Sequence, residues 1–203
     1  MTLQRLVLWR HGETGHNATG RIQGHLDALL TETGVEQARR AAPAVARFEP
    51  EVALSSDLRR AMDTAAEYTR VSGREVRMDK RLRETHVGEW QGLSSAEVEE
   101  GWPGALALWR ADPTWAPPGG ENRIEVAARA AEVVAELDAA HDGTALLCVH
   151  GGLITGLTGS LLGLPVANWP SLSGLYNCHW TVLARRGESL GWRLVAHNAG
   201  VTD

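Results

Sequence analysis

The chain has 203 residues, of which 43% are hydrophobic and 22% charged, values typical of one globular domain with a substantial core. Its formal net charge of −5 argues against a general binder of nucleic acid or of anionic membranes. The N-terminal residues contain no long apolar region followed by a small-residue cleavage site, so no signal peptide is expected. Cys148 and Cys178 form no CxxC motif and suggest neither a disulfide framework nor a zinc cluster. We expect a cytoplasmic protein.

Short apolar runs alternate along the chain with helical patterns, and this alternation predicts an α/β fold. The sheet should be mostly parallel and covered by helices on both faces, with one late antiparallel strand. The predicted strands are residues 3–9, 52–54, 75–78, 145–149, 176–184 and 190–196.

The predicted helices begin and end at recognisable signals. Thr33 and Glu36 together resemble a capping box at the start of a helix. Pro43 lies within that helix and should shorten or kink it. Ser56 or Asp57 should cap a second helix, which ends before residue 73. Two further helices are predicted, over residues 122–140 and 153–162.

Residues 143–184 contain no Asp, Glu, Lys or Arg, so a membrane span has to be considered. The apolar runs in this segment are about five residues long, whereas roughly 20 are needed to cross a bilayer. We interpret the segment as a buried strand, a buried helix and a polar loop.

Residues 88–120 are irregular in pattern and rich in Gly, Pro and Trp. A stretch of this length is too long for an ordinary connection, which predicts a cap or lid inserted in a single domain of residues 1–203. It contains Trp90, Trp102, Trp109 and Trp115. These indoles could present flat faces to a sugar ring or form the small core of the cap.

Polar clusters follow two predicted strands, Arg10-His11-Gly12 after the first and His150-Gly151-Gly152 after residues 145–149. Open α/β sheets bind ligands at the carboxyl ends of their strands, which would bring these clusters together. A loop histidine can be a neutral imidazole nucleophile, and a neighbouring arginine can hold an anion. Either cluster alone could equally be a surface loop.

Two other segments carry groups suited to the same chemistry. Arg59 and Arg60 lie at the start of a predicted helix, where amide groups and the helix dipole also favour an anion. Glu84, His86 and Glu89 lie where the chain leaves the predicted sheet. Taken singly, these are compatible with an exposed basic pair and a solvated loop.

Five motifs occur in a fixed order between Leu6 and about Asn198: RHGET, LTETGVEQA, SSDLRRAMDTA, LRETHVGEWQG and VHGG. Together they resemble the histidine phosphatase superfamily, branch 1, also called phosphoglycerate mutase-like. The resemblance implies a three-layer α/β/α fold with a small cap. It also implies a phosphomonoesterase that works through phosphohistidine, without a metal or another cofactor.

The resemblance also implies a role for each matching residue. His11 would attack phosphorus, while Arg10, Arg60 and His150 would bind the phosphoryl oxygens. Glu84 would protonate the leaving alcohol and then activate water, with Glu89 as the second choice of carboxylate. Arg60 matches the family pattern rather than Arg59. The remaining residues that would line the phosphate pocket are Asn17, Gln23 and Gly151.

His11 must be neutral to attack, and neighbouring cations should lower its pKa and favour that form. A bell-shaped dependence of rate on pH is therefore expected.

Alternatives to a phosphatase remain open at this stage. A cofactor-dependent phosphoglycerate mutase would carry additional basic residues, but residues 85–149 contain no lysine and only three arginines, Arg110, Arg123 and Arg129. A non-catalytic sensor of a phosphorylated ligand is less compatible with a complete set of catalytic residues. A metal site is disfavoured because His11 and His16 are poorly spaced to share one helical face.

The substrate is expected to be a small phosphorylated metabolite. The stretches RLRETHVGEWQGLS, TWAPPGGE and LPVANWPSL resemble the branch of the superfamily that dephosphorylates glucosyl-3-phosphoglycerate. That resemblance would place residues 119–121 at the border of the site. Residues 165–180 are uncharged and could form a homodimer interface, or they could pack on the sheet of their own chain.

Overall fold

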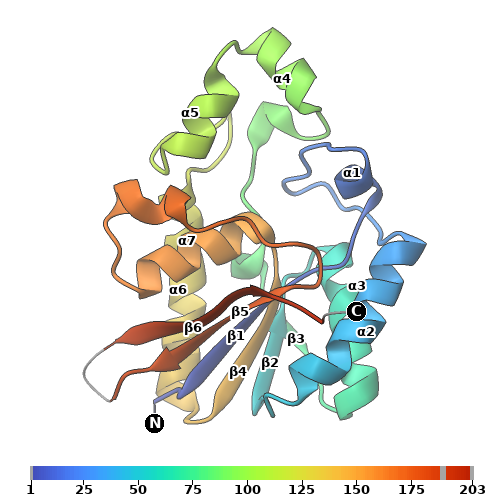
Figure 1. Cartoon of the computed structure of the whole chain (residues 1–203), viewed down its shortest axis with the longest axis vertical. Coiled ribbons are helices and arrows are strands. Elements are labelled where there is room, and N and C mark those ends of the chain that lie inside the picture. Colours follow the sequence, from blue (N-terminus) through green and yellow to red (C-terminus); the bar gives the residue numbers. More distant parts are fainter. Residues whose placement is uncertain (1, 188–190, 202–203) are drawn as a thin grey trace.

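The computed structural model describes residues 2–187 and 191–201 and contains one six-stranded sheet (Figure 1). The strand order is β3-β2-β4-β1-β5-β6. The bounds are β1 Arg5–Arg10, β2 Val52–Ser55, β3 Arg77–Met78, β4 Thr144–Val149, β5 Trp180–Arg185 and β6 Trp192–Ala199. The first four strands pair in parallel, and β5 is antiparallel to both of its neighbours. The predicted sheet with one antiparallel strand is confirmed, although residue 190, where the last predicted strand begins, lies outside the described residues.

Helices cover both faces of the sheet, which gives the predicted three layers (Figure 1). On β1, Leu6 and Leu8 pack with α6 (Arg123–Ala140) and α7 (Gly151–Leu161). The alternate residues Val7 and Trp9 pack with α2 (Glu32–Ala46) and α3 (Arg59–Ser72). Because side chains of a strand alternate between faces, each buried strand contributes to two separate apolar clusters.

The predicted starts of α2 and α3 are wrong. The N-cap of α2 is Thr31, whose side chain accepts a hydrogen bond from the amide of Gly34, so Thr33 lies within the first turn. The helix continues through the exposed Pro43 to Ala46. Capping signals identify the region of a helix start better than the residue, because several nearby hydroxyls can accept the free amides.

The start of α3 also differs from its prediction. Its N-cap is Leu58, whose apolar side chain cannot accept a hydrogen bond. Of the two predicted caps, Ser56 accepts from the amide of Leu58, before the helix, and Asp57 pairs with Arg83. The predicted end is confirmed, since Gly73 adopts a left-handed conformation with φ 71°.

Residues 88–120, the segment expected to form a cap, lie beyond the carboxyl end of β1 (Figure 1), and we call this segment the cap. They contain η2 (Gly88–Trp90), α4 (Ser95–Gly101) and α5 (Ala105–Ala111). Trp90 is fully buried, and its ring centroid lies 6.2, 5.8 and 5.4 Å from those of Trp102, Trp109 and Trp115. The four tryptophans therefore form an apolar core for the cap.

The segment 165–180 packs on its own chain. Trp169, in η3 (Val166–Ser171), contacts α7 at Gly159, and Trp180 lies edge-on to Phe48 with 6.3 Å between ring centroids. The remaining short elements are α1 (Gly15–Ala18) and η1 (Lys80–Leu82). Among the described residues, no helix is both long and apolar enough to span a membrane.

Candidate active site

His11 and His150 meet because their strands are neighbours in the sheet. Strands β1 and β4 pair in parallel with Arg10 opposite Val149, so the residues after both strands emerge side by side. The two imidazole centroids lie 5.2 Å apart, and both rings are buried. The predicted convergence of the two histidine clusters is confirmed.

The imidazole of His11 has a defined orientation and proton. Its Nδ1 lies 2.7 Å from the carbonyl oxygen of Gly12. Since a carbonyl oxygen can only accept, we assign the ring proton to Nδ1. The other nitrogen, Nε2, accepts a hydrogen bond from Nε of Arg60 at 3.3 Å. The nitrogen with a free lone pair therefore faces an arginine.

Burial lowers the pKa of His11 well below its ordinary value, and the positive charges of Arg60 and then Arg10 lower it further. The prediction gave the cations as the cause, whereas desolvation is the larger one. Either way, His11 is neutral at pH 7 and is able to act as a nucleophile.

Arg60 is a buried cation held in one position. It lies in the first turn of α3, and its Nη1 and Nη2 donate to the carbonyl oxygens of Leu26 (2.9 Å) and Gly24 (2.8 Å). Burial lowers its pKa to about 10, so it remains charged at pH 7. Arg59 is exposed and pairs with Asp63, which agrees with the choice of Arg60.

Three buried nitrogen atoms near His11 have no hydrogen-bond partner within the described part of the chain. They are Nε of Arg10 and both ring nitrogens of His150. Buried polar atoms are nearly always paired in folded proteins, so a cluster of unpaired ones is typical of a binding site. Arg10 is fixed by a hydrogen bond from Nη1 to the carbonyl oxygen of Leu175.

Glu84 lies on the opposite side of the site, at the N-terminus of α7. Its Oε1 accepts hydrogen bonds from the amides of Thr85 (2.8 Å) and Leu153 (3.1 Å), and its Oε2 accepts one from Gly152 (3.0 Å). A Cβ atom at position 152 would lie 2.7 Å from the carboxylate, so this approach requires glycine. Glu89 is exposed in the cap, which disagrees with its ranking as an alternative carboxylate.

A cavity of about 200 Å³ joins these groups. Its lining includes Arg10, His11, Asn17, Gln23, Arg60 and Glu84, as predicted. His150 and Gly151 are not among its lining residues, but the His150 ring lies beside that of His11, and a Cβ atom at position 151 would lie 3.5 Å from Nε of Arg10.

The side of the cavity nearest the cap was not predicted. It is formed by Arg21, Ile22, Val87 and Trp109. Trp109 could have been found from the sequence, because it is one of the four tryptophans of residues 88–120. Nothing in the sequence pointed to Arg21, Ile22 or Val87. The prediction that residues 119–121 border the site is wrong, because the loop packs against Gly88 at the base of the cap and does not line the cavity.

Another contact missed from the sequence comes from the residues before β5. Asn177 donates from Nδ2 to the carbonyl oxygen of His11 (3.1 Å) and to Oδ1 of Asn17 (3.2 Å). The amide of Cys178 donates to the same carbonyl, with Cys178 at φ 57°. Residues 176–179 therefore form a support for the loop of His11 rather than the start of a strand.

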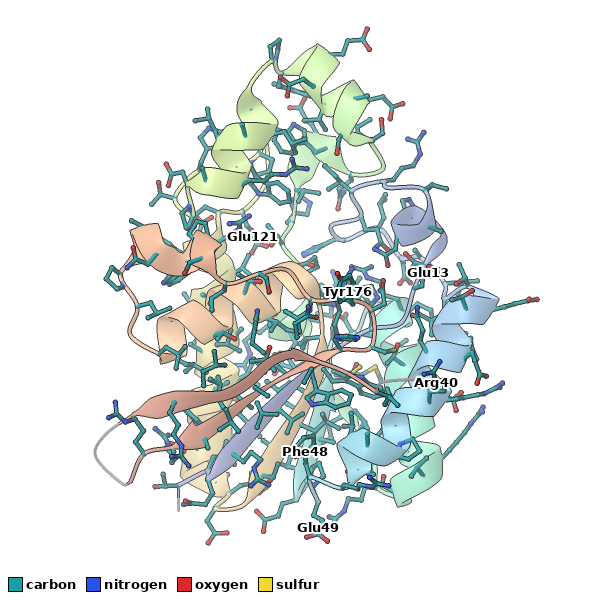
Figure 2. All side chains as sticks on the ribbon, viewed as in Figure 1. Glu13, Arg40, Phe48, Glu49, Glu121 and Tyr176 are labelled. Carbon is teal, nitrogen blue, oxygen red and sulfur yellow. The ribbon has the colours of Figure 1, made fainter. Side chains whose placement is uncertain are left out.

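A larger hollow of about 710 Å³ is lined by residues of this support and of α2. It includes Glu13 and Tyr176, which Figure 2 labels. Its lining includes three glutamates, at positions 13, 32 and 36. Negative charge is unsuited to a phosphate ester, so the smaller cavity at His11 is the candidate active site.

A neutral nucleophilic histidine, two fixed arginines and a carboxylate around one cavity define a phosphoryl-transfer site. The chain belongs to the histidine phosphatase superfamily (branch 1), whose family model matches residues 6–200. It is a phosphatase of this superfamily and thus a phosphoric monoester hydrolase.

Its similar relatives include the glucosyl-3-phosphoglycerate phosphatase of Mycobacterium tuberculosis, which is 47% identical over 98% of this chain and 96% of the relative. The corresponding phosphatase of Mycolicibacterium vanbaalenii is 46% identical over the same shares. A solved structure of mycobacterial glucosyl-3-phosphoglycerate phosphatase with VO3 superposes with a TM-score of 0.93. It is 50% identical and covers 97% of this chain and 100% of that one.

Proposed function

We propose that this phosphatase hydrolyses glucosyl-3-phosphoglycerate through a phosphohistidine formed at His11. The observation that carries the mechanism is the environment of His11 Nε2, an unprotonated nitrogen that faces Arg60. Arg10 and His150 lie around it with buried, unpaired nitrogens. These groups supply the positive charge and the donors that a phosphoryl group in transfer requires.

In the first step, Nε2 of His11 attacks phosphorus in line with the leaving alcohol. The guanidinium groups of Arg10 and Arg60, with His150, stabilise the charge on the equatorial oxygens. The bond between phosphorus and the ester oxygen breaks, and protonated Glu84 gives its proton to that oxygen. The products are the free alcohol and phosphohistidine.

In the second step, water attacks phosphohistidine while the Glu84 carboxylate takes a proton from that water. The bond between nitrogen and phosphorus breaks, which releases inorganic phosphate and restores neutral His11. Asn17 and Gln23 help to shape the phosphate pocket, and Gly151 supports it behind Arg10. The charges used in both steps come from side chains, so no metal is assigned to the site.

The relatives named above support the proposed substrate, and the cavity has suitable chemistry on its cap side. Trp109, Ile22 and Val87 offer an apolar wall, and Arg21, which pairs with Glu97 at 2.9 Å, lies at its edge. A sugar ring presents apolar faces with hydroxyl edges, a pattern that aromatic side chains recognise well.

Hydrolysis is favoured over mutase activity because few cations near the cap remain available for a second phosphate. Arg129 is paired with Glu121, and Arg123 lies over the ring of Trp109 at 5.5 Å. The cytoplasmic location and the homodimer stay predictions.

A substrate panel tests the proposal. Phosphate release would be compared for glucosyl-3-phosphoglycerate, 3-phosphoglycerate and simple sugar phosphates, with formation of 2-phosphoglycerate assayed in parallel. We expect the highest kcat/KM for glucosyl-3-phosphoglycerate and no activity in His11→Ala. Faster isomerisation of 3-phosphoglycerate than hydrolysis of any ester would overturn the proposal.

A further inference from the structure

Glu84 is held at its main chain as well as at its carboxylate. Its carbonyl oxygen accepts a hydrogen bond from Nη2 of Arg129 at 2.8 Å, and Nε2 of His25 lies 2.7 Å from the same oxygen. Nη1 of Arg129 donates to the carbonyl oxygen of Arg81 at 2.6 Å. The guanidinium of Arg129 therefore binds the backbone at both Arg81 and Glu84.

Glu121 fixes the other side of this guanidinium. Its two carboxylate oxygens pair with Nε and Nη2 of Arg129, both at 3.0 Å. This is the bidentate geometry in which Arg cannot be replaced by Lys without losing hydrogen bonds. Both side chains are largely shielded, with 19% and 26% of their surface exposed.

The same glutamate closes the base of the cap, where Figure 2 labels it. Its amide donates to the carbonyl oxygen of His86 at 2.7 Å, and its carboxylate accepts from the amide of His86 at 2.8 Å. The chain leaves for the cap just after Glu84 and returns at Glu121. The two ends of the cap are therefore joined to each other and, through Arg129, to Glu84.

We propose that Arg129 and Glu121 are positioning residues for Glu84, and that they couple the seating of the cap to the placement of the general acid. This rests on the proposed function. The carboxylate of Glu84 is bonded to the amide of Thr85, which follows the carbonyl that Arg129 holds. Rotation of this peptide displaces the carboxylate from the leaving oxygen, and a displacement of about 1 Å can cost about 100-fold in rate.

The test separates positioning of the acid from a general loss of structure. p-Nitrophenolate leaves without protonation, whereas the alkoxide of glucosyl-3-phosphoglycerate requires it. Release of the phenol or alcohol would be followed in a single turnover, with enzyme in excess. For Glu84→Gln we expect a loss of about 100-fold or more with the alkyl ester and less than about threefold with p-nitrophenyl phosphate.

Arg129→Lys and Glu121→Gln should reproduce this selectivity for the alkyl ester, with losses of about tenfold or more for the lysine variant. Because Arg129 acts through Glu84, adding Arg129→Lys to Glu84→Gln should lower the alkyl rate no further. Equal losses with both esters, no loss with either, or a further loss in the double variant would overturn the proposal.

A matched control is available in Arg185, which pairs with Asp138 at a comparably shielded position at the other end of the sheet. Arg185→Lys should leave both single-turnover rates unchanged, and circular dichroism would confirm that each variant is folded. The proposed function fails separately, if the wild-type protein forms no phosphohistidine or if Glu84→Gln shows no dependence on the leaving group.

Discussion

Burial of His150 makes the stability of the protein sensitive to acid. The burial of this ring lowers its pKa well below the ordinary value, and the charge of Arg60 lowers it further. In the unfolded chain the same imidazole has a pKa of about 6.5. As the pH falls through this value, the unfolded state takes up a proton that the folded state does not, so the free energy of unfolding decreases.

The magnitude follows from that difference. Between pH 7 and pH 5, one histidine that stays neutral when folded removes up to about 2 kcal/mol of stability. His11, whose pKa is also lowered by burial, contributes to the loss over the same interval, whereas carboxylates such as Asp57, whose pKa is lowered mainly by its hydrogen bond to Arg83, contribute only at lower pH. We therefore predict how the loss of stability between pH 7 and pH 5 differs between the wild-type protein and a His150 variant, and not the total loss.

Replacing His150 by Gln removes its titration and leaves the other groups in place. Unfolding by urea would be measured for both proteins at pH 7 and pH 5. The loss of stability over this interval should be smaller in His150→Gln by up to about 2 kcal/mol. An equal loss in both proteins would refute the conclusion that His150 is held neutral in the fold.

Three further predictions concern positions in and near the site. Arg60→Lys should lower kcat/KM by about 100-fold or more, because a lysine cannot make the three directed contacts of the guanidinium; a loss under threefold in steady-state assays would contradict this. In Gly12→Ala the new Cβ would lie 2.4 Å from the carbonyl oxygen of Gly34, so a loss of about 1–3 kcal/mol is expected in chemical denaturation. Gly15→Ala, with no atom within 4 Å of its Cβ, is the matched control and should not lose stability. Trp90→Ala should cost about 3–5 kcal/mol by loosening the cap core and should raise KM more for glucosyl-3-phosphoglycerate than for p-nitrophenyl phosphate; an equal rise for both would argue against a role of the cap in specificity.

The parts of the site that lie at strand ends were predictable from sequence. His11 and His150 each follow a short apolar strand, and parallel neighbours bring such residues together whatever their separation along the chain. Arg60 could be located because a helix start is a natural place for an anion-binding group. These predictions depend on local patterns and on one general property of parallel sheets.

The supporting contacts were not predictable, because they depend on how loops fold back. Asn177 reaches the carbonyl oxygen of His11 only because Cys178 turns the chain in a left-handed conformation. The pair Glu121–Arg129 lies on the return from the cap, and its contact with Glu84 depends on tertiary packing. The N-cap of α2 was not predictable either, because several neighbouring hydroxyls besides that of Thr31 could have capped the helix.

In the proposed mechanism, His11 carries the phosphoryl group between the two steps. The direct measurement is alkaline quenching, which preserves phosphohistidine, within one turnover of a ³²P-labelled ester, followed by location of the label by peptide mapping. Cleavage after Arg10 and Arg21 yields a peptide that contains both His11 and His16, so variants at each position are needed. We expect acid-labile, alkali-stable label in the wild-type protein and in His16→Gln, and none in His11→Gln. Label that persists in His11→Gln while ester hydrolysis continues would contradict it.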